Sequence, residues 1–276
     1  MQDWQQGDIS SNGILIHYYR TGGVDKPPLI LAHGFTDNGL CWTRTAEALM
    51  SEFDVVMVDA RNHGLSGAGP ADVGSLAADL AALVAQLELG VVSALGHSVG
   101  ASVVATFAAD YPDLVARLVL EDPPWRRPSA VADAKPDNPK GEKAQSPRDT
   151  AFRELVATMA QFSDAEMLQH GRSQHPSWPE AEYIPWGQSN RQVSADAMAL
   201  LELGDWPAVA KGVLCPSLLI CADTSRDAIV SPDTAAWIQQ LNPMFSTRQV
   251  SDAGHNVRRE NFAGYISLVR EFLTSA

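Results

Sequence analysis

Residues 91–108, VVSALGHSVGASVVATFA, decide the fold. A short apolar run leads into Gly96-His97-Ser98-Val99-Gly100, and an apolar segment rich in small residues follows. This is the pattern G-x-S-x-G between an expected strand and an expected helix, where the serine lies on a sharp turn. Gly96 and Gly100 fit that turn, because side chains there would meet the neighbouring strand and helix. We therefore predict that the Ser98 hydroxyl stands above the sheet, beside a helix N-terminus that favours negative charge.

The composition is that of an ordinary globular protein with an acidic surface. The chain has 276 residues, of which 45% are hydrophobic, and a net charge of -13. This charge makes nucleic acid and anionic membranes poor partners. Residues 1–13 lack the basic and apolar parts of a signal peptide, and no apolar run reaches membrane-spanning length, so we expect a cytoplasmic protein. Cys41, Cys215 and Cys221 form no C-x-x-C motif and are expected to be buried thiols.

Apolar runs alternate with segments of helical periodicity along most of the chain. Alternation around Asn12-Gly13 predicts a hairpin over residues 8–20. Continuous apolar runs predict buried strands at 27–32, 53–58, 91–95, 115–120 and 215–222, and a last strand is expected at 246–250. Helices are expected at 42–50, 73–89 and 232–241, with another at the C-terminus. The pattern indicates a mostly parallel, doubly wound α/β sheet of eight strands, with function at the carboxyl ends of the strands.

Residues 124–212 interrupt this alternation and are expected to form a helical lid between strands 6 and 7. The core domain would then comprise residues 1–123 and 213–276. Residues 135–148 predict a mobile loop, and helices are expected at 149–162, 163–170 and 194–204, the second opening on a capping box at Ser163. We expect Trp125, Trp186 and Trp206 to line a substrate pocket. Alternatively, the tryptophans fill the core of a small helical domain.

A serine nucleophile needs a base within hydrogen-bonding reach and an acid that orients the base. His255 is the candidate base, since it follows the last expected strand on a glycine-containing loop at the same edge as Ser98. For the acid we favour Asp227, in the loop after the penultimate strand. Asp223, nearer the strand end, and Asp122, after the strand that precedes the insertion, stay open.

The negative charge of a tetrahedral intermediate needs two fixed hydrogen-bond donors. Val99 follows the nucleophile at the start of the expected helix, so its backbone N–H is one candidate. The backbone N–H of Phe35 is the other, in a loop that Gly34 allows to approach closely. His33 is expected to brace that loop rather than to react.

Five motifs together resemble the α/β-hydrolase fold superfamily, with greatest similarity to esterases, cofactor-free haloperoxidase-like enzymes and carbon–carbon bond hydrolases. They are His33-Gly34-Phe35, residues 59–66 (DARNHGLS), residues 96–100 (GHSVG), residues 227–230 (DAIV) and Gly254-His255. The resemblance implies a Ser98–His255–Asp227 triad with the backbone N–H groups of Phe35 and Val99 as the oxyanion hole. Serine at position 98 departs from the dehalogenase and epoxide-hydrolase branches, which carry aspartate there.

We expect a carboxylesterase-like hydrolase that cleaves a small, fairly apolar ester through an acyl-enzyme on Ser98. Its partner would be this small-molecule ester, with neither nucleic acid nor membrane, and a homodimer stays open. A lactonase or carbon–carbon bond hydrolase with the same triad is the alternative, as is a ligand-binding receptor on this fold. No cofactor or metal is expected, because no metal-ligand spacing and no phosphate-binding G-x-x-x-x-G-K-[ST] motif occurs.

Overall fold

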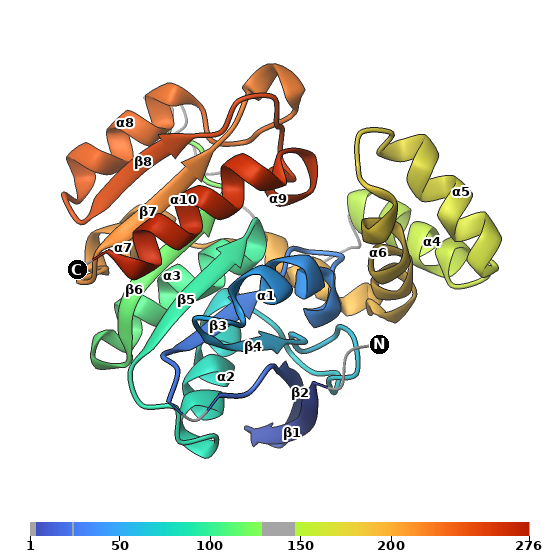
Figure 1. Ribbon diagram of the computed structural model, residues 1–276. Helices are drawn as coiled ribbons and strands as arrows, with labels where there is room; N and C mark the ends of the chain where they lie inside the picture. Colours follow the sequence, from blue (N-terminus) through green and yellow to red (C-terminus); the bar gives the residue numbers. More distant parts are fainter. Residues whose placement is uncertain (1–3, 24, 129–146, 276) are drawn as a thin grey trace, which may run out of the picture.

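The computed structural model describes residues 4–23, 25–128 and 147–275. Its centre is one eight-stranded sheet with the strand order β1-β2-β4-β3-β5-β6-β7-β8 (Figure 1). The pairs β1/β2 and β2/β4 are antiparallel, and every other neighbouring pair is parallel. The strands are β1 (Gln5–Ser11), β2 (Ile14–Arg20), β3 (Pro28–Ala32), β4 (Asp54–Val58), β5 (Val92–His97), β6 (Val115–Glu121), β7 (Ser217–Cys221) and β8 (Phe245–Gln249). The predicted mostly parallel eight-stranded sheet is confirmed.

Helices cover both faces of the sheet because its inner strands are apolar on both sides. One face packs against α1 (Thr43–Leu49), α9 (Val257–Glu260) and α10 (Phe262–Thr274). The other face packs against α2 (Val73–Gln86), α3 (Val99–Asp110), α7 (Trp206–Gly212) and α8 (Pro232–Leu241). Short 3-10 turns η1 (Gly39–Trp42), η2 (Pro112–Leu114) and η4 (Thr224–Arg226) lie in the connections. These two layers fix the carboxyl edge of the sheet, where the motifs of the sequence meet.

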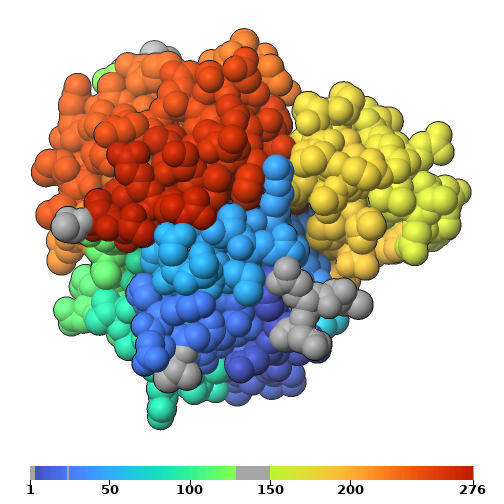
Figure 2. Space-filling view, viewed as in Figure 1, coloured from blue at the N-terminus to red at the C-terminus, as the bar shows by residue number. Residues whose placement is uncertain are grey.

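Between β6 and β7 the chain forms α4 (Pro147–Met159), α5 (Asp164–Gln174), α6 (Glu180–Gln192), η3 (Ala195–Leu201) and α7. In Figures 1 and 2, α4, α5 and α6 stand as a separate yellow lobe beside the sheet. The capping box at Ser163 is confirmed, since its hydroxyl accepts from Glu166 N–H and the Glu166 carboxylate accepts from Ser163 N–H. By contrast, α7 packs against α3 and α8 on the sheet.

Two helices of this insertion have no counterpart among the expected segments. Helix α6 was missed because Pro185 lies inside it and its polar composition conceals the periodicity, and α7 because it is short. The expected helix at 194–204 is the 3-10 turn η3. Of the loop predicted at 135–148, residues 135–146 lie outside the described residues, and residues 147 and 148 belong to α4 instead.

Two further expectations concern side-chain burial and helix length. All three cysteines are free and buried, as predicted. In the part of the chain that the structure describes, no helix has the length and apolarity needed to cross a membrane.

Candidate active site

Ser98 lies on a strained turn between β5 and α3. Its φ of 53° and ψ of -122° lie outside the regions that L-residues ordinarily adopt. A Cβ atom on Gly96 would come within 2.3 Å of Gly100 O, and one on Gly100 within 2.3 Å of Ala32 O. The expectation that both positions must be small is therefore confirmed. The tight turn leaves the serine side chain at the carboxyl edge of β5.

His255 bridges the serine and a buried carboxylate. Its Nε2 lies 3.1 Å from Ser98 Oγ, and its Nδ1 lies 2.6 Å from Asp122 Oδ2. An ionised carboxylate only accepts hydrogen bonds, so Nδ1 carries the proton and Nε2 presents its lone pair to the serine hydroxyl. The three side chains thus stand in the order and tautomer that a serine nucleophile requires.

The acid that contacts His255 is Asp122, so the preference for Asp227 was wrong. Asp227 is exposed, has a left-handed backbone with φ of 69°, and forms no hydrogen bond with another described residue. Asp223 caps η4, where it accepts from Ser225 N–H at 2.8 Å. The reason lies in the strand order: β6 is the direct neighbour of β5, and Ser98 N–H donates to Glu121 O at 2.9 Å. The residue after Glu121 is therefore beside the nucleophile, whereas β7 is one strand further away.

The loop that was expected to supply the acid instead supplies backbone donors. Ile229 N–H and Val230 N–H donate to the Asp122 carboxylate at 2.8 and 2.9 Å. Asp122 is 0% exposed, and two backbone hydrogen bonds offset much of the free-energy cost of burying its charge.

Neither of the two backbone N–H groups that were expected to form the oxyanion hole, those of Phe35 and Val99, donates to another described residue. Val99 is the first residue of α3, so its N–H has no partner within the helix. Gly34 allows the close approach of the Phe35 loop, because a Cβ atom there would lie 2.8 Å from His97 Nδ1 and 3.6 Å from Ser98 Cβ.

His33 and His63 contact the backbone of the Phe35 loop and hold it in place. His33 Nδ1–H donates to Gly34 O at 2.8 Å, and its Nε2 accepts from Ala60 N–H at 3.0 Å. His63 Nε2 lies 2.6 Å from Phe35 O. Burial lowers the pKa of His33 to about 3, so this ring is neutral at pH 7, and burial also lowers the pKa of His63. The expectation that His33 braces this loop is confirmed.

A third buried imidazole fixes the loop that carries the base. His97 Nε2–H donates to the backbone oxygen of His255 at 3.0 Å, and the two rings lie 4.8 Å apart. Burial, followed by the charge of Arg258, lowers the pKa of His97 far below its usual value. The neutral ring therefore positions His255 without competing with it for a proton.

Two arginines directly after the His255 loop join an ion cluster. Asp37 pairs with Arg258 at 2.7 Å and with Arg259 at 3.0 Å. Arg258 also contacts Glu121 at 3.3 Å, and Arg259 contacts Glu182 of α6 at 3.2 Å. Burial alone would raise the pKa of Asp37, but the charges of Arg259 and Arg258 lower it well below its usual value. The cluster thus ties the catalytic loop to the core and to the inserted helices.

A pocket opens around Ser98 and His255 and has an aromatic wall. His175 stacks on Trp178 at 3.8 Å, and Trp186 meets His175 edge-on at 5.5 Å. Arg259 lies over the Trp178 ring at 4.4 Å. The residues that line the pocket are Gly34, Phe35, Thr36, Asp37, His97, Ser98, His175, Trp178, Trp186, His255, Asn256 and Arg259.

Of the three tryptophans expected in the pocket, only Trp186 lines it. Trp125 is fully buried, donates from Nε1 to Ser102 Oγ at 2.9 Å, and stacks on Trp206 at 5.0 Å. Trp206 in turn meets Trp237 of α8. Trp125 and Trp206 therefore belong to the main core beneath α3 and α7, and their assignment to the pocket was wrong.

The sequence reasoning missed Trp178, His175 and Arg259 in the wall of this pocket. Arg259 stands four residues after His255, which is the one sequence signal that could have drawn attention to it. His175 and Trp178 lie in an insertion whose packing no motif reports. Within the described ranges, no group of three or more His, Cys, Asp or Glu residues is arranged to hold a metal ion.

Comparisons with known proteins identify the family of this chain. The family model for the alpha/beta hydrolase fold matches residues 27–260. An N-formylmaleamate deformylase from Pseudomonas putida is 31% identical over 271 residues, which cover 97% of this chain and 96% of the relative. An sn-1-specific diacylglycerol lipase from Danio rerio is 27% identical, over 91% of this chain and 80% of the lipase.

Among solved structures, the N-formylmaleamic acid deformylase of Pseudomonas putida S16 superposes with a TM-score of 0.77 and 28% identity. The match covers 96% of this chain and the whole of that chain. With the family model matched over most of the sequence, the chain belongs to the α/β-hydrolase fold family and is a hydrolase.

Proposed function

We propose that this hydrolase uses Ser98 as a nucleophile and cleaves a small, fairly apolar carboxylic ester through an acyl-enzyme. The observation that carries the proposal is the continuous hydrogen-bonded chain from Ser98 Oγ through His255 to Asp122. Isolated serine hydroxyls are weak nucleophiles at neutral pH, and this chain supplies both the base and the group that stabilises its charged form.

The reaction begins when His255 Nε2 takes the hydroxyl proton as Ser98 Oγ attacks the ester carbonyl carbon. The carbonyl oxygen becomes negatively charged and accepts from the N–H groups of Phe35 and Val99. Asp122 stabilises the imidazolium that forms. His255 then gives its proton to the leaving alkoxide, the carbon–oxygen bond breaks, and an alcohol departs.

Water completes the cycle. It loses a proton to His255 Nε2 while its oxygen attacks the acyl carbon, and collapse of the second tetrahedral intermediate returns the proton to Ser98 Oγ and releases the carboxylic acid. The proposal needs no cofactor and no metal ion.

Amide hydrolysis is a second candidate, favoured by the 31% identity to a protein named N-formylmaleamate deformylase. The same groups would serve, with His255 protonating a leaving nitrogen in place of an oxygen. A panel that pairs p-nitrophenyl esters with N-formyl amides, compared by kcat/KM, separates the two candidates.

The test of the proposal is a stopped-flow experiment with p-nitrophenyl acetate. We expect a burst of one p-nitrophenol per protein molecule when deacylation is slower than acylation, and loss of hydrolysis in Ser98→Ala. Mass spectrometry of the quenched reaction should show one acetyl group on the peptide that contains Ser98. Turnover that persists unchanged in Ser98→Ala would refute the proposal.

A further inference from the structure

The pocket around Ser98 has a polar side in addition to its aromatic wall. Asn256 directly follows His255, Arg259 lies in α9, and both line the pocket. Arg259 Nη1–H donates to Asn256 Oδ1 at 3.1 Å. This hydrogen bond fixes the orientation of the Asn256 amide, so that its oxygen faces Arg259 and its NH2 group is left for another acceptor.

The protein itself leaves several hydrogen-bond donors on this side unpaired. Asn256 Nδ2 donates to no other described residue. A guanidinium has five N–H groups, and those of Arg259 that have partners are three, which donate to the residues Glu182, Asn256 and Asp37. The other two have no acceptor among the described residues, although the Arg259 side chain is only 2% exposed. Because buried donors are nearly always paired, this side of the pocket suits a ligand that accepts several hydrogen bonds.

His175 adds a further donor to the same pocket. Its ring is stacked on Trp178, is half-buried, and forms no hydrogen bond with a described residue. An imidazole carries at least one N–H in either protonation state. An acceptor in the pocket can therefore bind His175 as well as the Asn256 amide and the Arg259 guanidinium.

The charges around the polar side favour an anion as that acceptor. Asp37 also lines the pocket, but its two oxygens accept from Arg258 and Arg259. Glu121 and Glu182 contact the same arginines and do not line the pocket. At the pocket wall one carboxylate is thus shared by two guanidinium groups, although the chain as a whole has a net charge of -13.

The imidazoles that line the pocket respond to the same local charge. Burial is the first cause that lowers the pKa of His97, and the charge of Arg258 is the next. Burial also lowers the pKa of His175, followed by the charge of Arg259. In both cases the arginine has a larger effect than the opposing charge of Asp37. The local charge is therefore one that attracts an anion.

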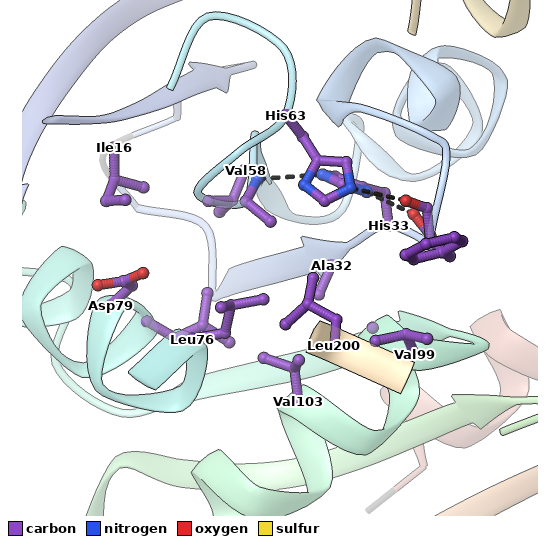
Figure 3. Close-up of a pocket in the computed structure, with 15 residues that line it drawn as sticks. Ile16, Ala32, His33, Val58, His63, Leu76, Asp79, Val99, Val103 and Leu200 are labelled. Carbon is purple, nitrogen blue, oxygen red and sulfur yellow. Dashed lines mark hydrogen bonds between the residues drawn. The ribbon is translucent and has the colours of Figure 1, made fainter. Parts of the chain in front are cut away.

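The far side of the Phe35 loop offers an anion no comparable partners. Ala32, Val103 and Leu200 face one another there in Figure 3. Asp79 is negative and forms a two-pronged ion pair with Arg61 at 2.8 and 2.6 Å. An anionic group of a substrate would lose its hydrogen bonds to water on that side and find none in return.

We propose that Asn256, Arg259 and His175 form a subsite for a carboxylate carried by the leaving group of the substrate. The planar guanidinium matches the geometry of a carboxylate, and the Asn256 and His175 donors add to the same contact. Asn256 is next to His255, which protonates the leaving group, so the subsite lies on the leaving side of the scissile bond. The inference rests on the proposed function and narrows it to small esters of hydroxycarboxylic acids.

The experiment compares two acetyl esters, 3-acetoxypropanoate and its neutral amide, 3-acetoxypropanamide. Both give the same acetyl-enzyme, so the ratio of their kcat/KM values depends on the leaving group alone. Each value is divided by the rate of hydrolysis by hydroxide, which removes the difference in intrinsic reactivity. We expect the carboxylate ester to be favoured at least about tenfold, because charge-assisted hydrogen bonds are stronger than neutral ones.

Asn256→Asp tests the subsite itself. The new side chain keeps an oxygen for Arg259 but replaces the NH2 group by a carboxylate oxygen, which repels an anion. The carboxylate-to-amide ratio should fall at least about tenfold. A general effect of the new charge on His255 acts on both esters and cancels in the ratio. Asn12→Asp is the matched control, since it adds the same charge at an exposed turn outside the pocket and should leave the ratio unchanged.

Equal reactivity of the two esters in wild type, or an unchanged ratio in folded Asn256→Asp, overturns the inference. Should Asn256→Asp fail to fold by circular dichroism, calorimetric titration of Ser98→Ala with each ester decides. Tighter binding of the carboxylate ester by at least about tenfold supports the subsite, and equal binding overturns it. If the proposed function fails, neither ester is hydrolysed in a Ser98-dependent manner, and the titration still decides the inference. If only the inference fails, both esters are hydrolysed by Ser98 with equal efficiency.

Discussion

Replacing Asp122 by asparagine tests the assignment of the acid most directly. In the structure, Asp122 Oδ2 accepts from Ile229 N–H and from His255 Nδ1–H, and Oδ1 accepts from Val230 N–H. An asparagine has one oxygen, so at least one of these donors must face an NH2 group. If the NH2 group faces Val230 N–H, the tautomer of His255 survives, but the imidazolium that forms during the reaction loses its carboxylate partner. If it faces His255, it also faces Ile229 N–H, and the imidazole is held in the wrong tautomer.

Both orientations reduce the rate, and the size of the reduction follows from the interaction that is lost. The same change in serine proteases lowers kcat about 10⁴-fold, and we expect a fall of about 10²- to 10⁴-fold in kcat/KM for Asp122→Asn. One buried donor left unpaired should also lower the free energy of unfolding by about 1–3 kcal/mol. The assay is p-nitrophenyl acetate hydrolysis beside urea unfolding, with Asp227→Asn as the control, because that side chain is exposed. Near-normal activity in folded Asp122→Asn, or a large loss in Asp227→Asn, would refute the reasoning.

Two further predictions concern the supports of the site. Burial lowers the pKa of His33 to about 3, so the unfolded chain, with an ordinary pKa near about 6.5, takes up a proton first and stability falls as the pH drops below about 6.5. Between pH 7 and pH 5 this difference in pKa should lower the free energy of unfolding by about 2 kcal/mol. In His33→Gln the amide can still donate to Gly34 O and accept from Ala60 N–H, so the free energy of unfolding measured in urea should fall by about 2 kcal/mol less than in wild type. An identical fall in both proteins contradicts the prediction. Glu182→Gln should weaken the contact between α6 and Arg259, lower the melting temperature and speed tryptic cleavage within α4–α6. Glu180→Gln on the same helix is the control, because it removes only an exposed ion pair with Arg172 and should change neither the melting temperature nor the rate of tryptic cleavage. Equal effects of the two substitutions would show that the ion cluster does not anchor these helices.

The parts of this protein that could be predicted from sequence are those whose backbone geometry requires particular residue types at nearby positions. Ser98 was identifiable because its turn requires Gly96 and Gly100, and both glycines lie within two residues of it in the sequence. His255 was identifiable because the carboxyl ends of parallel strands meet at one edge, which brings distant loops together. The sheet followed from the lengths and apolarity of its strands in the same way.

The acid could not be fixed in this way, because several loops at that edge carry aspartates and only the register of neighbouring strands decides between them. Asp122 follows β6, the strand beside the nucleophile, and the chain from Asp223 to Val230 turns so that its N–H groups face that carboxylate. The tryptophans were misassigned for a related reason. Trp125 and Trp206 stack on each other in the core, a pairing across 81 residues of chain that no local pattern encodes.

The pocket around Ser98 has walls from two different parts of the chain. Loops at the carboxyl edge of the sheet carry Phe35, Ser98 and His255, whereas His175, Trp178 and Trp186 come from α6 and the segment that precedes it. A buried ion pair between Glu182 and Arg259 joins the inserted helices to the catalytic loop. Movement of these helices would therefore reshape the aromatic wall while the catalytic groups, held by the sheet, kept their places.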